Sequence, residues 1–269
     1  MTSIVIGGLA ALLYLLTGGL LGVRLARAGQ GHAQGKNALL ATGALAALLH
    51  AVVLAHTVML NDGVNLGFFN ALSCTAWLIA VLLLAAATFR PVENLGIFLL
   101  PFAAAAIVLA LIFPSHRIVS DTAQWPLDLH IVASITAYSV LTLAAVQAIL
   151  LAVRDYRLRH RQPPGLLRGI PPLTTMESLL FQLIGVGFVL LSLALLTGLL
   201  FLEDIFAQHL VHKTTLSITA WIVFGILLWG RWRFGWRGRR AIAWTLGGFT
   251  ALMLAYFGSK LVLELILRR

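Results

Sequence analysis

Long apolar stretches separated by short polar segments run along the whole chain. Each stretch is about 20 residues long, the length that an α-helix needs to cross the hydrocarbon core of a bilayer. Inside the hydrocarbon, each backbone N–H and C=O group must be satisfied within its own segment, which favours helices. The pattern predicts about eight transmembrane helices, at residues 3–23, 38–60, 68–89, 95–113, 130–152, 177–202, 213–230 and 242–265.

The composition points to the same class of protein. Hydrophobic residues make up 60% of the chain and charged residues 10%, and the mean hydropathy is +0.97. A water-soluble fold would lack the polar side chains to cover its surface. We therefore expect an all-α, polytopic membrane protein in which residues 1–269 form a single transmembrane domain surrounded by lipid.

The distribution of basic residues predicts the orientation. The loops after the odd-numbered helices carry 14 of the lysines and arginines, and the other side carries 5. Because basic residues are retained on the cytoplasmic side, both termini are expected in the periplasm of a bacterial inner membrane. The net charge of +10 then serves insertion and contact with anionic lipid rather than nucleic-acid binding.

Several classes of enzyme are excluded by motif. The single cysteine, Cys74, rules out an internal disulfide, a C-x-x-C redox pair and a C-x-x-C-H haem attachment site. The chain also lacks a P-loop, a G-x-G-x-x-G sequence and an H-E-x-x-H sequence, which mark nucleotide enzymes and zinc proteases. The sequence therefore gives no sign of an ATP-driven pump, a nucleotide enzyme or a zinc protease.

Histidines are the most informative polar residues in so apolar a chain. His50 lies about ten residues from either end of the second predicted helix, roughly 15 Å from the membrane surface. An imidazole at that depth forms a hydrogen bond between helices, ligates a metal or haem, or lines a polar cavity. Gln147, Ser192 or Tyr138 could supply its hydrogen-bond partner.

His130 opens the fifth predicted helix at the outer boundary, where a ligand could reach it from the periplasm. It is the leading candidate for binding a haem iron. The alternative is that Asp128 caps the helix and that His130 is only an interface residue. His50 and His130 differ by roughly 15 Å in depth and could not ligate one iron together. His56 and His212, both near the outer edge, are the candidate partners of His130.

Several of these residues occur in a pattern that resembles the cytochrome c assembly protein family, which includes the CcsA proteins, and within it the YpjD/HemX-like inner-membrane branch. The resemblance covers nearly the whole chain. It rests on His50, residues 65–73, His130 with Ser134 and Tyr138, residues 212–221, residues 235–240 and residues 255–258.

The resemblance implies a protein that handles haem in the membrane, with His130 in the place of the first outer histidine of the family and His50 in that of an early helix histidine. The loop expected at residues 203–213 is short and lacks the tryptophans of the family's haem-presenting segment. We therefore expect haem binding or haem homeostasis, with another membrane protein of haem or cytochrome biogenesis as partner, rather than catalysis. A transporter with a polar path around His50 and an accessory or regulatory subunit without a cofactor are the alternatives.

Overall fold

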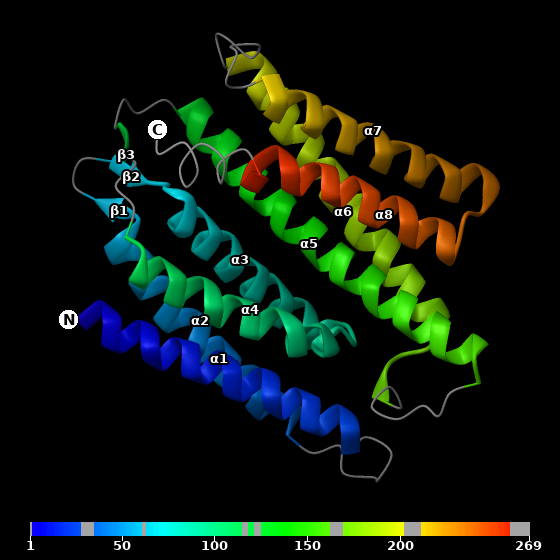
Figure 1. Cartoon of the computed structure of the whole chain (residues 1–269), viewed down its shortest axis with the longest axis horizontal. Coiled ribbons are helices and arrows are strands. Elements are labelled where there is room, and N and C mark those ends of the chain that lie inside the picture. The colour runs from blue at the N-terminus through cyan, green and yellow to red at the C-terminus, as the bar shows by residue number, and fades with distance from the viewer. Residues whose placement is uncertain are drawn as a thin grey trace. The chain divides into compact units, whose positions relative to one another are not determined.

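The computed structural model describes residues 2–27, 35–60, 63–114, 118–120, 125–161, 169–201 and 211–258. Eight long helices account for most of this described part (Figure 1). They are α1 (Thr2–Arg27), α2 (Lys36–Thr57), α3 (Phe68–Phe89), α4 (Gly96–Ile112), α5 (Trp125–Arg159), α6 (Leu173–Phe201), α7 (Val211–Phe234) and α8 (Arg239–Met253). A 3-10 turn at Glu93–Leu95 precedes α4, and a π-helical turn at Leu254–Gly258 continues α8. With these two turns included, all eight helices are long and apolar enough to cross a membrane, which confirms the predicted fold class.

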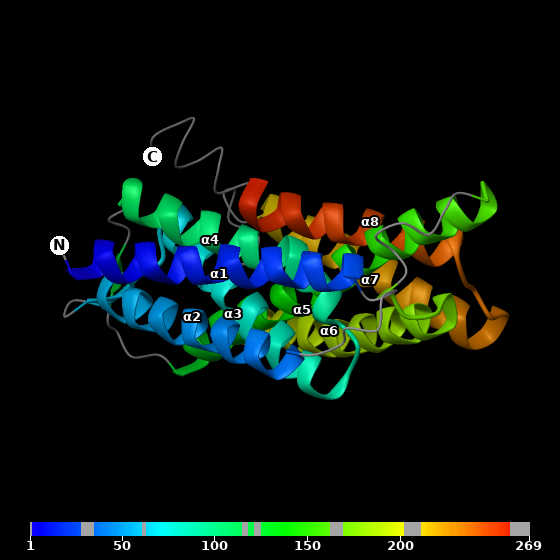
Figure 2. The same cartoon turned by 90° about the horizontal axis from the view of Figure 1, so that it is seen from below.

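The chain divides into two compact units. The first, residues 1–122 with 162–171, contains α1 to α4, and α1 packs against both α2 and α4 (Figures 1 and 2). The second, residues 123–161 with 172–269, contains α5 to α8, and α5 packs against both α6 and α8. The expectation of a single domain concerns how the two units combine and stays a prediction.

A small antiparallel sheet lies in the first unit, where the sequence predicts only helix and loop. Its strands are β1 (Met59–Leu60), β2 (Gly63–Asn65) and β3 (Ile118–Ser120), with β2 in the middle. Helix α2 therefore ends at Thr57 instead of residue 60. Asn70 contributes to this ending, because its side-chain amide donates to the carbonyl oxygens of Thr57 and Asn65, each at 3.3 Å.

Helix α5 is longer than predicted at both ends. It has 35 residues, about 52 Å of helix, and so exceeds a hydrocarbon core of about 30 Å. Pro126 occupies the second position, where proline needs no hydrogen-bond donor. At the other end, Arg159 donates to Asp155 one turn earlier at 2.9 Å. Hydropathy located the apolar centre of this helix, but its polar ends follow from these local interactions.

Helices α5 and α6 approach closely at Gly187. A Cβ atom at this position would lie 2.5 Å from Cδ2 and 2.7 Å from Cγ of Leu141, which is fully buried on α5. Two residues earlier, Gly185 faces open space, with no atom within 4 Å of a Cβ built there. The two glycines are therefore not equivalent: one sets the separation of two helices and the other does not.

Candidate functional site

His130 lies on the second turn of α5 and is partly exposed. Its Nδ1 atom is 2.9 Å from the carbonyl oxygen of Ala194 on α6, and 3.3 Å from the hydroxyl of Thr197. Both residues are buried on α6. The imidazole is therefore held against the neighbouring helix by one of its two ring nitrogens.

This contact settles which nitrogen carries the proton. A carbonyl oxygen can only accept a hydrogen bond, so Nδ1 of His130 must be the donor. A neutral imidazole protonated at Nδ1 presents an unprotonated Nε2, which is the form that ligates a metal. No partner for Nε2 is found among the described residues. Donation from the other ring nitrogen to a backbone carbonyl is the usual support of a ligating histidine.

Asp128 does not cap α5, contrary to one alternative drawn from the sequence. The helix begins at Trp125, so Asp128 lies within its first turn, and His130 follows two residues later. Two residues that position the imidazole, Ala194 and Thr197, were not predicted from the sequence. A threonine near the end of a strongly apolar helix was the available signal, but the sequence does not show which histidine it faces.

His50 occupies a closed polar cluster in the first unit. It is fully buried on α2, with Nε2 at 2.8 Å from the Ser73 hydroxyl on α3 and Nδ1 at 3.4 Å from the Tyr14 hydroxyl on α1. The Tyr14 ring also meets the imidazole edge-on, with centroids 5.8 Å apart. His50 thus joins three helices, and its partners are not the Gln147, Ser192 or Tyr138 suggested by the sequence.

Both ring nitrogens of His50 are therefore engaged within the protein. A neutral imidazole donates from one nitrogen and accepts at the other, which matches two hydroxyl neighbours. Ligation of iron by His50 would require Ser73 or Tyr14 to give up its hydrogen bond. The geometry favours the hydrogen-bonding role over the ligand role or a water-filled path, and the ligand role stays a prediction.

Replacing His50 with alanine is expected to destabilise the first unit. The variant would leave the buried hydroxyls of Ser73 and Tyr14 without this partner and open a cavity between three helices. We expect a loss of about 1–3 kcal/mol in the free energy of unfolding. The measurement is the midpoint of thermal unfolding in mild detergent.

The matched control is His56→Ala, six residues along the same helix, because His56 is exposed. Its unfolding midpoint should stay close to that of the unchanged protein. Equal midpoints for the two alanine variants would show that the cluster around His50 contributes nothing to stability.

The structure describes only some of the remaining histidines. The backbone of His212 lies at the second position of α7, and the position of its side chain is outside the description. His32, His116 and His209 also lie outside the described residues. His160, at the far end of α5, is exposed and contacts the Tyr156 carbonyl of its own helix.

The geometry of the second unit places His130 and His212 near the same end. Helices α5 and α6 are antiparallel, since His130 meets Ala194 and Gln147 donates to Met176. Helices α6 and α7 are antiparallel as well, since Trp221 donates to Ser192 and Arg231 lies over Phe181. The starts of α5 and α7 therefore share one end. No group of three or more His, Cys, Asp or Glu gathers into a metal-ion site within the described ranges, but haem needs only one or two such ligands.

Comparison with known proteins adds to this geometry. A family profile described as Cytochrome C assembly protein matches residues 38–267. The inner membrane protein YpjD of Escherichia coli K12 is 35% identical over 228 residues, which cover 82% of this chain and 85% of that protein. The cytochrome c biogenesis protein CcsA of Synechocystis is 28% identical over 90 residues, 33% of this chain and 27% of that protein. No solved structure matches the chain.

Proposed function

The chain belongs to the cytochrome c assembly protein family, and from that premise we propose that it binds haem in the bacterial inner membrane and serves haem handling or homeostasis. The observation that carries the proposal is the imidazole of His130, fixed by Ala194 with Nε2 unprotonated. Among the candidate histidines whose side chains are described, His130 combines a defined tautomer with a ring nitrogen that has no partner in the described ranges.

The residues of this chain fit the requirements of a haem ligand. Ala194 and Thr197 orient the His130 ring, so that little side-chain freedom is lost when Nε2 meets an iron. Haem, when bound, supplies an iron centre that accepts imidazole nitrogen and a porphyrin that apolar side chains can surround. His212, in the same unit, is the candidate for a second ligand, and the role expected for His56, in the first unit, stays a prediction.

The sequence favours reversible binding of haem over carrying it covalently or presenting it for attachment. Its single cysteine, Cys74, offers no thiol pair, and residues 203–213 lack the tryptophans of a haem-presenting segment. The protein would hold or sense haem while a partner membrane protein of haem or cytochrome biogenesis carries out the chemistry.

The proposed orientation places His130 at the periplasmic side and both termini in the periplasm. In the second unit, α5 and α7 carry arginines in their last turns, at the opposite end from His130, and α8 begins there with Arg239 and Arg240. Basic residues beside membrane helices are retained in the cytoplasm, so this end is the cytoplasmic one. Haem would then approach His130 from the periplasm or the outer leaflet.

An absorption spectrum tests the function directly. The protein is produced in cells supplied with haem, purified in mild detergent, and measured in the oxidised and reduced states. We expect a Soret band and a shift of the visible bands on reduction. Absence of a Soret band after haem supply would contradict the proposal, and stable co-purification with another membrane protein would then favour the accessory or regulatory role.

A further inference from the structure

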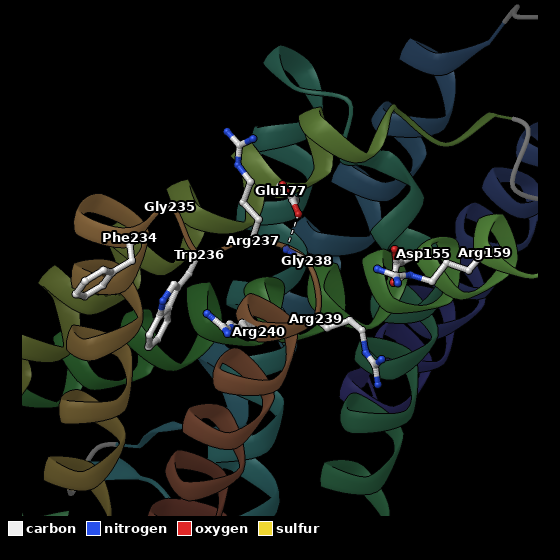
Figure 3. Close-up of a pocket in the computed structure, with 10 residues that line it drawn as sticks. All are labelled: Asp155, Arg159, Glu177, Phe234, Gly235, Trp236, Arg237, Gly238, Arg239 and Arg240. Atoms are coloured by element: carbon white, nitrogen blue, oxygen red, sulfur yellow. Dashed lines mark hydrogen bonds and ion pairs between the residues drawn. The ribbon is translucent and has the colours of Figure 1, made fainter.

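A pocket lies at the end of the second unit opposite His130. It has a volume of about 510 Å³ and is formed by the end of α5, the start of α6 and the turn between α7 and α8 (Figure 3). This volume is within the usual range for small-molecule sites. The proposed haem function makes no use of this pocket.

The pocket carries excess positive charge. Four arginines and two carboxylates line it, a net charge of +2. The carboxylates are already engaged: Asp155 accepts from Arg159 at 2.9 Å, and Glu177 accepts from the backbone N–H of Gly238 at 2.7 Å. Both carboxylates keep their charge in these bonds, and the excess of two positive charges already takes them into account.

Three of these arginines, Arg237, Arg239 and Arg240, are exposed and have no hydrogen-bond or ion-pair partner in the part of the chain that the structure describes. All three line the pocket, and Figure 3 shows their side chains leaving the turn in different directions. With four arginines against two carboxylates, the lining keeps an excess of positive charge, which favours an anion as the ligand of this pocket.

The turn that presents these arginines is anchored. Arg231 donates to the carbonyl oxygen of Trp236 at 3.2 Å, and the Trp236 N–H donates to Gly230 at 3.2 Å. The Trp236 ring packs against Trp244, with centroids 5.5 Å apart. Gly238 adopts a φ of 55° that suits glycine, and its bond to Glu177 ties the turn to α6. The backbone bearing the arginines is therefore positioned before a ligand arrives.

We propose that this pocket binds the phosphate of an anionic phospholipid headgroup. Guanidinium groups match phosphate oxygens in planar, two-pronged hydrogen bonds, which makes phosphate the chemical class that this set of side chains recognises. Phe234 and Trp236 line the same pocket and supply apolar surface for the glycerol region of a lipid.

The position of the pocket favours a lipid over a soluble phosphate. It lies where α7 ends at Phe234 and α8 begins at Arg239, both of which could span the membrane. Trp232 is 77% exposed and Trp229 58% exposed on the last turns of α7. Exposed tryptophans at a helix end are typical of the membrane–water boundary, the level at which headgroups lie.

The test is a lipid titration of the delipidated full-length protein in detergent, read by native mass spectrometry. Phosphatidylglycerol and phosphatidylcholine are compared in the unchanged protein and in the double variant Arg239→Gln/Arg240→Gln. We expect the unchanged protein to prefer phosphatidylglycerol, and the variant to bind it about tenfold more weakly with little change for phosphatidylcholine.

The matched control is Arg27→Gln/Arg90→Gln, which removes the same charge from exposed positions on the same predicted side of the membrane. Equal weakening in both double variants would overturn the proposal in favour of diffuse attraction. Displacement of phosphatidylglycerol by inorganic phosphate or pyrophosphate would overturn it in favour of a soluble phosphate site.

A second variant tests the proposal even if the glutamine variant misfolds. Arg239→Lys/Arg240→Lys keeps the charge but loses the two-pronged geometry. The proposal expects weaker binding of phosphatidylglycerol by this variant, with an unchanged unfolding midpoint. Binding equal to that of the unchanged protein would contradict recognition by guanidinium groups.

Discussion

The His130→Ala variant is expected to lose the Soret band when it is purified from haem-supplied cells. The substitution removes Nε2, the ring nitrogen left available by the hydrogen bond from Nδ1 to Ala194. Substituting residues that merely support a metal ligand costs 10–100-fold in affinity, so removal of the ligand itself should lower the haem content by more than about tenfold. The measurement is haem per protein, taken from the absorption spectrum.

The control for this experiment is His160→Ala. His160 directly follows the last residue of the same helix, is exposed, and contacts Tyr156 alone among the described residues. Its variant should keep the full Soret band. Retention of the band in His130→Ala, with normal unfolding, would exclude His130 as the ligand, while loss in both variants would show that the measurement reports general damage.

The Gly187→Val variant is expected to destabilise the second unit. Already the first added carbon would lie within 2.5–2.7 Å of two carbon atoms of Leu141. Leu141 is fully buried and has little room to move, so α5 and α6 must separate. We expect a loss of about 1–3 kcal/mol in the free energy of unfolding, and a fall of about 2–10 °C in the midpoint of thermal unfolding.

Gly185→Val distinguishes this steric effect from the general effect of replacing glycine in a helix. Position 185 is on the same helix and has open space around its Cβ direction. Removing glycine from a helix is favourable in itself, so this variant should match or slightly exceed the stability of the unchanged protein. Similar destabilisation by both variants would contradict the close approach at Gly187.

Hydropathy was sufficient to predict the number and approximate positions of the helices, because the lipid environment imposes a length and a composition on each of them. It failed where other interactions set the end of an element. Helix α5 extends through Asp155 and Arg159 because their ion pair supports its last turn, although charge ends an apolar window. Residues 59–60 form a strand because β2 offers a partner, which no apolar pattern reveals.

The candidate site could be predicted as a set of residue types but not as an arrangement. His130 and His50 stand out in any reading of so apolar a chain, yet their environments depend on which helices are neighbours. The bond from His130 to Ala194 joins residues 64 positions apart, and that from Tyr14 to His50 joins residues 36 apart. The pocket at the α7–α8 turn could not be predicted, because only the structure shows that basic and aromatic residues there enclose space.

The polar cluster around His50 also bears on where this protein can be shortened. The family profile begins at residue 38, which leaves α1 outside it. Yet α1 packs against α2 and α4, and its Tyr14 supplies one of the two partners of His50. A fragment trimmed to residues 38–267 would lack α1, so the surfaces of α2 and α4 that pack against α1 would face lipid. Nδ1 of His50 would also lose its contact with the Tyr14 hydroxyl. We therefore expect the segment needed for the first unit to fold to be longer than the segment that the family profile matches.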